Sequence, residues 1–435
     1  MRRRTWGGLD PDALGRRARA LHLVGEVRDL RGDSEGALTA FGEAERTTAE
    51  LLARDPENPD RMFDHAQSVF YVGQVAYMRK DWPTAETRFR RYVELADGMA
   101  ATDPAKPKWI AEQAYAANSL GVLFLDRGNP VAAADQLGRY VELTRRLMEL
   151  NPNDTGRIYD HAQANAWLAD SFHELGRWPD ARSARLAELR VYAELFLSDP
   201  KDARARQGYA VAQDALAAIA LANGAVDEAV DHSEAGMGAI LAMLAEDSAN
   251  MEWLDNAVGL ATTRAEALLL TGDIEGAAQS IEWALPNVQR LAAQDPANLS
   301  VRERLIRASY LGIAVAHHRG DRDGARRLDA AFRTRFPAAS AGSTAELAMT
   351  SRMLVDTMAA FDALARGDGE AAQRFRASAL GMSVSPTEPR RIAAIRVLNA
   401  PPFGPGDKVS LVTATGATAA GGYPLERLLE PVRGP

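Results

Sequence analysis

The sequence predicts an all-α protein, a right-handed α-α superhelix of about seven helical hairpins closed by a C-terminal cap. The first observation is a period of 48 residues that runs along most of the 435-residue chain. An Asp-Pro-like step recurs with this period at Asp55-Pro56, Asp103-Pro104, Asn151-Pro152, Asp199-Pro200, Asp247-Ser248 and Asp295-Pro296. Between these steps a glycine recurs, with Lys80 in its place once, at Gly32, Gly128, Gly176, Gly224, Gly272 and Gly320. Five residues after each of these positions comes an alanine, at Ala37, Ala85, Ala133, Ala181, Ala229, Ala277 and Ala325.

The composition is the second observation. Hydrophobic residues make up 46% of the chain, charged residues 25% and aromatic residues 7%, which is typical of a folded protein whose helices pack closely. The chain has no cysteine, so disulfides, thiol nucleophiles and thiolate metal sites are excluded. The net charge of −8 argues against a nucleic-acid groove, which needs clustered Lys and Arg.

Each period predicts two helices separated by the glycine turn. The first repeat has helical patterns over 16–30 and 35–53, after a basic leader at 1–15. Glycine suits the turn because a helix often ends on a left-handed residue, a conformation that strains other side chains. Lys80 is therefore expected either to adopt that conformation or to turn the chain by another route. The proline of each Asp-Pro step ends the second helix, because proline disfavours helical geometry in the preceding residue.

The repeats are expected to form one array over 16–381. Repeat seven (300–336) has a shortened second helix, and 345–380 form a last shortened pair that caps the array. Small residues recur in the first helix and let the paired helices approach closely, at Gly25, Gly73, Gly121, Ala169, Ala217 and Ala265. Residues 382–435 are rich in Pro and Gly, so we expect a largely irregular tail with one short strand at 409–413.

The sequence shows no export signal and no membrane span. The N-terminal residues are basic, but no apolar stretch of signal-peptide length follows them. The best candidate for a membrane span, 208–226, contains Gln213, Asp214 and Asn223 and lies in register as one more repeat helix. We therefore expect a soluble, cytoplasmic protein.

Four features of the unit together resemble the tetratricopeptide repeat (TPR). They are the small residue of the first helix, the glycine that ends it, the alanine five residues later and an aromatic such as Phe41 or Phe89 four residues further on. The usual TPR has about 34 residues, so this longer unit resembles a bacterial variety that carries an Asp-Pro-x-Asn-x-x-Trp step. Here that step leads from Asp103 to Trp109 and, in altered form, from Asp247 to Trp253. Three second helices depart from the pattern at the aromatic position, with Arg185, Ser233 and Asp329.

The resemblance covers residues 16–380 and implies a solenoid whose first helices line a concave face. Proteins of this family use that face to bind extended peptides or partner helices. The resemblance also implies an alternative role. Bacterial arrays of this kind often form the C-terminal part of multidomain signalling proteins, beside kinase, cyclase or winged-helix modules. In that case the chain is a regulatory or sensory segment.

One stripe of the first helices combines aromatic and amide side chains. In the second repeat it follows the spacing i, i+3, i+4, i+7 and i+10, and it differs from the apolar stripe that holds Val69 and Val72. Aromatics provide a large contact area at low entropic cost and amides hydrogen-bond a main chain, so the stripe suits partner binding. The alternative is that several of its aromatics pack against the next repeat. The stripe consists of Gln67, Phe70, Tyr71, Gln74, Tyr77, Tyr115, Asn118, Val122, Gln163, Trp167, Asp170 and His173.

The sequence contains no convincing catalytic or metal motif. Asp-His pairs at 64–65 and 160–161 suit either a base with its orienting carboxylate or, as we favour, a structural feature repeated in the array. His317 and His318 lack the spacing that places two imidazoles on one helix face, and the chain has no HExxH, P-loop or GxGxxG motif. We expect a non-enzymatic scaffold, without cofactor or metal, that binds a protein or peptide in the groove of repeats two to four. No nucleic-acid partner is expected.

Overall fold

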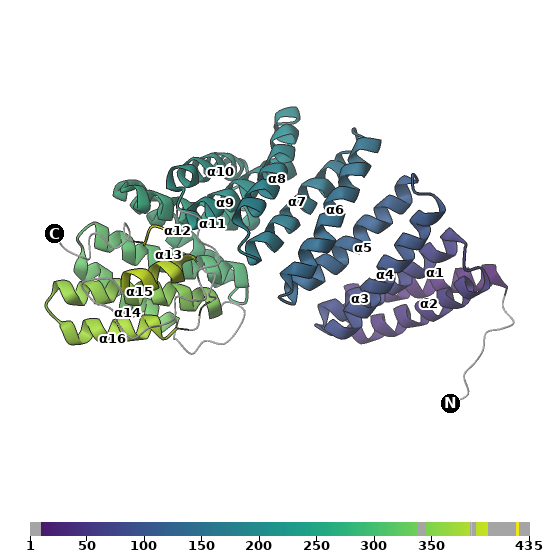
Figure 1. Ribbon diagram of the computed structural model, residues 1–435, viewed down its shortest axis with the longest axis horizontal. Coiled ribbons are helices and arrows are strands. Elements are labelled where there is room, and N and C mark those ends of the chain that lie inside the picture. The colour runs from purple at the N-terminus through teal and green to yellow at the C-terminus, as the bar shows by residue number, and fades with distance from the viewer. Residues whose placement is uncertain (1–9, 337–344, 383, 385–388, 399–422, 426–435) are drawn as a thin grey trace. The chain divides into compact units, whose positions relative to one another are not determined.

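The computed structural model describes residues 10–336, 345–382, 384, 389–398 and 423–425 (Figure 1). The described residues are helical wherever they form regular secondary structure, which confirms the all-α class. The chain divides into two compact units, Met1–Glu188 and Leu189–Pro435, which are treated separately below. The strand expected at 409–413 lies outside the described residues.

Unit 1 is a stack of helical hairpins of nearly equal length. In the first three hairpins the first helix packs against the second, as α1 does on α2, and the second packs against the first helix of the next hairpin, as α2 does on α3. Apart from the part of α8 that belongs to it, unit 1 contains α1 (Pro11–Leu30), α2 (Ser34–Arg54), α3 (Pro59–Met78), α4 (Trp82–Thr102), α5 (Pro107–Asp126), α6 (Pro130–Leu150) and α7 (Thr155–Glu174).

Unit 2 begins with helical hairpins of the same length and ends with shorter helices. Helix α8 (Trp178–Ser198) crosses the boundary at residue 188. The second helix α14 is shortened and a last pair, α15 and α16, closes the array as predicted, although only α16 is short and α15 has the full 21 residues. Five full-length helices come first: α9 (Ala203–Ala222), α10 (Val226–Glu246), α11 (Met251–Thr271), α12 (Ile274–Gln294) and α13 (Leu299–His318). They are followed by α14 (Arg322–Arg335), α15 (Ala345–Ala365), α16 (Gly369–Leu380) and α17 (Pro389–Leu398).

Helix α17 lies in the segment for which the sequence predicts a largely irregular tail. It packs against α15 and α16. Further along, Tyr423 is 2% exposed and Leu425 is 0% exposed, and both belong to the apolar core of unit 2. The C-terminal segment therefore contributes both a helix and core residues to this unit.

Asparagine and aspartate at fixed places in the period explain where the helices begin. Their side chains accept backbone N–H groups of the first turn, a cap worth about 1 kcal/mol. Lys106 takes the same place before α5 and makes no side-chain cap. First helices are capped by Asp10, Asn58, Asp154, Asp202, Asn250 and Asn298. Second helices are capped by Asp33, Asp81, Asn129, Asp273 and Asp321.

The turn between the two helices of a repeat is left-handed at the predicted residue. The glycines of the series all have positive φ, between 66° and 90°. Lys80 takes the first of its two expected routes, since it has a φ of 60° and is the one non-glycine residue with positive φ in the described part of the chain. A left-handed residue with a side chain costs about 1–2 kcal/mol.

Small residues face large ones where the two helices of a hairpin cross. A Cβ added to Gly25 would lie 2.4 Å from the ring of Phe41, and one added to Gly73 would lie 2.8 Å from that of Phe89. The seven alanines of the second helices are only 0–1% exposed. Close helix approach is therefore built into the period, as the sequence predicts.

Candidate functional site

Side chains one repeat apart join the first helices of unit 1 into a layer. Gln67 on α3 donates from Nε2 to Glu112 Oε2 on α5 at 3.0 Å. The Tyr77 hydroxyl donates to the Asp126 carboxylate. The guanidinium of Arg157, on α7, donates to the hydroxyl of Tyr115 at 2.9 Å. The predicted stripe therefore lies where neighbouring first helices meet.

Two aromatics of the stripe form the centre of this layer on α3. Tyr71 stacks on Phe41 with ring centroids 4.9 Å apart, and His22 of α1 lies edge-on to it at 5.2 Å. The ring centroid of Phe70 lies 5.5 Å from that of Tyr92 on α4. Both stripe residues are half-buried, so they pack between repeats and still present part of their surface. The rings that they contact belong to the preceding repeat for Tyr71 and to the second helix of its own repeat for Phe70.

The other stripe residues differ in how much they present. Tyr115 is 39% exposed. Gln163 and His173 are exposed, and the His173 ring lies 4.8 Å from that of Trp178 in a T-shaped contact. Asp170 pairs with the largely buried guanidinium of Arg185, which occupies the aromatic position of its repeat. The half-buried members include Gln74, Val122 and Trp167.

Asn118 is a stripe residue with an unused acceptor. Its Oδ1 atom is buried and has no hydrogen-bond partner among the residues that the structure describes. A buried amide oxygen without a partner costs roughly 1–3 kcal/mol.

An open groove of about 440 Å³ runs between α1 and α3 in unit 1. Gln67 and Tyr71 of the predicted stripe line one side of it. The other residues were not predicted, among them His22, Leu23 and Glu26 of α1. The period held a signal for them, since Glu26 stands one period before Gln74 and Leu23 one period before Tyr71.

Burial shifts the pKa values of the titratable side chains that line the groove. It lowers the pKa of His22, whose Nε2 lies 2.9 Å from the Ser68 hydroxyl, so the ring is neutral near pH 7. Burial and the neighbouring Glu26 raise the pKa of Tyr71, which keeps its hydroxyl protonated. Burial also raises the pKa of Asp64 at the groove wall. The groove thus offers neutral rings and hydroxyls beside two acidic side chains.

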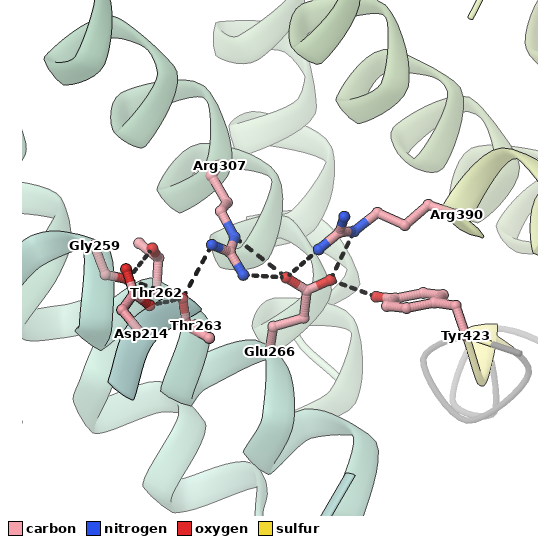
Figure 2. Close-up of polar contacts among 8 residues, drawn as sticks. All are labelled: Asp214, Gly259, Thr262, Thr263, Glu266, Arg307, Arg390 and Tyr423. Carbon is pink, nitrogen blue, oxygen red and sulfur yellow. Dashed lines mark hydrogen bonds and ion pairs between the residues drawn. The ribbon is translucent and has the colours of Figure 1, made fainter. Parts of the chain in front are cut away.

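Unit 2 holds a second polar cluster on its first helices, shown in Figure 2. Glu266 of α11 is 0% exposed and accepts from Arg307 of α13 at 2.8 Å. It also accepts from Arg390 Nε at 2.9 Å and Nη2 at 3.0 Å, and from the Tyr423 hydroxyl at 2.6 Å. Arg307 also donates from Nη1 to the Thr263 hydroxyl at 3.0 Å.

The charges of this cluster hold Glu266 ionised. Burial by itself would raise the pKa of the carboxyl, but the attraction of Arg390 and Arg307 outweighs it and holds the pKa well below its usual range. Burial and Glu266 raise the pKa of Tyr423 well above its usual range, so the phenol remains a donor. Thr263 completes the chain by donating to Asp214 at 2.6 Å.

This cluster uses the repeat positions of the predicted stripe. Glu266 stands four periods after Gln74, and Thr263 four periods after Tyr71. Asp214 is three periods after Phe70, and Arg307 is five periods after Gln67. The prediction named these positions only in repeats two to four, although the same period extends them to unit 2.

The Asp-His pairs have a structural geometry. His65 Nδ1 lies 3.1 Å from the Thr48 hydroxyl, and His161 Nδ1 lies 3.0 Å from that of Thr144. Each ring thus bonds a threonine of the preceding helix. No group of three or more His, Asp or Glu residues in the described part of the chain could hold a metal ion. Nor is any described helix long and apolar enough to cross a membrane.

Paired helices of equal length, left-handed turns and small residues at the crossings define a TPR-like helical-repeat protein. No family model matches the chain, and no curated protein matches it. Among solved structures it is similar to aspartyl phosphate phosphatase F from Bacillus subtilis, at 10% identity over 93% of this chain and 98% of that one, with a TM-score of 0.49. It is also similar to BtubC from P. vanneervenii, at 16% identity over 61% of this chain and 93% of that one, with a TM-score of 0.44. A tetratricopeptide repeat protein from Parabacteroides merdae is 11% identical over 77% of this chain and 99% of that one, with a TM-score of 0.39.

Proposed function

We propose that the chain is a non-enzymatic scaffold that binds an extended segment of a protein along the first-helix face of unit 1. The groove between α1 and α3 is the main contact. The observation that carries the proposal is this open groove, which contains Gln67 and Tyr71 of the stripe together with neutral and acidic groups. Its volume of about 440 Å³ lies within the range of ligand pockets.

The chemistry of the face suits a peptide main chain. An extended peptide carries one donor and one acceptor per residue, and both need partners once water is excluded. The exposed amide of Gln163 provides an acceptor and donors, and Gln67 keeps one amide N–H besides the one that it donates to Glu112. Half-buried aromatics such as Tyr71 and Trp167 lose little entropy on contact, because packing already holds them in place. The contact area of the aromatics therefore supplies most of the affinity. Hydrogen bonds to the amides fix the direction in which the bound segment runs.

The acidic groups of the groove favour a segment with a positive side chain. Glu26 and Asp64 both line it. Arg19 lines the same groove and keeps its charge balance close to neutral. One lysine or arginine that reaches Glu26 would gain a charge-assisted hydrogen bond without meeting a strongly acidic surface.

Peptides selected from a random displayed library on the full chain provide the test. Selected peptides are titrated against the wild type and against a variant with Tyr71→Ala, Tyr115→Ala and Trp167→Ala. We expect the triple variant to lose about tenfold or more in affinity while its helical circular dichroism is unchanged. A matched control is Val131→Ala, since Val131 is 68% exposed on the second helix α6.

Two results contradict the proposal. One is that the selected peptides bind the triple variant as tightly as the wild type. The other is that the control weakens binding as much as the triple variant does. The alternative role, as a regulatory segment of a multidomain signalling protein, stays a prediction.

A further inference from the structure

The stripe positions of unit 2 are covered by another part of the same chain. Glu266 and Thr263 correspond by period to Gln74 and Tyr71, which belong to the stripe proposed to bind partners in unit 1. In unit 2, Arg390 from α17 and Tyr423 from the C-terminal segment converge on Glu266 (Figure 2). These two residues are 124 and 157 positions away from Glu266.

We propose that the Glu266 site is a recognition site for a segment bearing an arginine and a tyrosine, and that the chain's own C-terminal segment occupies it as an intramolecular ligand. A partner segment that presents the same two groups binds here only by displacing Arg390 and Tyr423. This inference concerns unit 2 and does not depend on the groove of unit 1.

The geometry at Glu266 is that of a specific receptor for these two groups. Arg390 uses Nε and Nη2 on the two carboxylate oxygens, a bidentate arrangement that lysine cannot reproduce. Tyr423 donates to the oxygen that also accepts from Arg390 Nε. The Arg390 guanidinium lies 5.1 Å from the centre of the Tyr423 ring, so the two groups also contact each other as a cation and a π system.

The repeat array retains a paired carboxylate after the segment leaves. Arg307 is part of the array, and it holds Glu266 from α13 independently of the C-terminal segment. Removal of Arg390 and Tyr423 therefore leaves one guanidinium for one carboxylate and does not leave an isolated buried charge. Exchange of one segment for another therefore leaves no unpaired buried carboxylate in the array.

Access from solvent also fits an exchangeable ligand. The side chain of Arg390 is 23% exposed while that of Glu266 is 0% exposed, so the arginine reaches the buried carboxylate from the surface. Ala393, Ala394 and Leu398 of α17 are buried in the core of unit 2 and hold the segment in place. A tethered ligand acts at an effective concentration of the order of millimolar, so the bound state is favoured unless a competitor is tight or abundant.

The test uses the full chain and a fluorescein-labelled synthetic peptide with the sequence of residues 389–425. Fluorescence anisotropy reports binding of this peptide in trans. We expect the wild type to bind it weakly because the site is occupied. The double variant with Arg390→Ala and Tyr423→Phe is expected to bind it about tenfold more tightly. Addition of Glu266→Gln to the double variant should remove that gain.

Two further measurements keep the test decisive if a variant is destabilised. A peptide with Arg390→Glu is titrated against the same double variant and is expected not to bind, which tests recognition with the protein unchanged. The matched control is Arg319→Ala, which removes an exposed arginine that pairs with Glu275 and Glu282 on the same unit and should leave peptide binding at the wild-type level.

The outcomes separate clearly. Equal affinity of the wild type and the double variant for the peptide would show that the C-terminal segment does not compete for the site. Equal binding of the normal peptide and the Arg390→Glu peptide would show that Glu266 does not recognise the guanidinium. Either result overturns the proposal.

Discussion

Arg390 donates two hydrogen bonds to Glu266, from Nε at 2.9 Å and from Nη2 at 3.0 Å, and so ties helix α17 to helix α11. The carboxylate is buried in the first-helix layer of unit 2, and the guanidinium comes from outside the repeats. This relationship connects the stability of the unit with the recognition site proposed at Glu266. It therefore supports both a stability prediction and the binding experiment described above.

Replacement of Arg390 by alanine should destabilise unit 2 by about 2–3 kcal/mol, because a buried carboxylate loses one of its two guanidinium partners. The replacement by lysine should cost less, since it keeps the charge and loses the bidentate geometry. Thermal melts of the full chain measure both. Arg319→Ala is the control, because exposed ion pairs contribute about 0–1 kcal/mol. A melting temperature unchanged by Arg390→Ala would show that the contact is not stabilising.

His65 should make the stability of unit 1 depend on pH. Burial, with Arg91 and Arg88, lowers its pKa to about 4 in the folded protein, against about 6.5 for an unfolded chain. Between these values the unfolded state binds more protons, so stability is fully present above pH 6.5 and falls as the pH drops toward 4. The loss is of the order of 3 kcal/mol.

The measurement for this prediction is urea unfolding of the full chain at a series of pH values between 4 and 7.5. His65→Asn, which can still bond Thr48, should flatten the profile, whereas the exposed His173→Asn should leave it unchanged. A profile that keeps its slope in His65→Asn would show that another group causes it.

Two glycines of the first hairpin should respond in opposite ways to alanine. Gly25→Ala places a Cβ 2.4 Å from the Phe41 ring, so the helices must separate at a cost of about 1–3 kcal/mol. Gly42→Ala lies in the neighbouring helix with no atom within 4 Å of the new Cβ, and it should stabilise by about 1 kcal/mol. Ala133→Leu should overpack the third hairpin in the same way as Gly25→Ala. A higher melting temperature for Gly25→Ala than for Gly42→Ala would contradict the packing account.

Lys80→Gly should stabilise the second hairpin by about 1 kcal/mol, because glycine accepts a φ of 60° without strain. In the reciprocal change, Gly128→Lys, the new Cβ has no atom within 4 Å, and the positive φ should destabilise the third hairpin by a similar amount. Chemical denaturation of both variants checks the pair. If both variants changed the free energy of unfolding in the same direction, the left-handed backbone at these positions would not be the cause.

The period predicted much of the fold because each recurring residue has a local physical role. Gly32 and its equivalents supply the left-handed turn, and Ala37 and its equivalents supply the close crossing. Both roles involve contacts within one hairpin. A repeat period describes such contacts well, because each period contains one hairpin. The helix starts were less well predicted, since the capping role of residues such as Asp10 was not recognised and α1 begins at Pro11.

The candidate sites were harder to predict because they depend on contacts between repeats and beyond them. Tyr71 was predicted as a site residue, but the opposite wall of its groove is Glu26, in a repeat outside the predicted range. Glu266 could have been found by extending the register from Gln74. Its partner Arg390 could not, because that residue lies in no repeat and 124 residues of sequence separate the two.

Hydrogen exchange of the full chain, with and without a peptide selected for binding to it, tests the central claim most directly. The claim is that the first helices of unit 1 form the partner-binding face. The account predicts that the bound peptide slows exchange in α1, α3, α5 and α7, at residues 11–30, 59–78, 107–126 and 155–174. Slowed exchange confined to the second helices α2, α4 and α6 would contradict it.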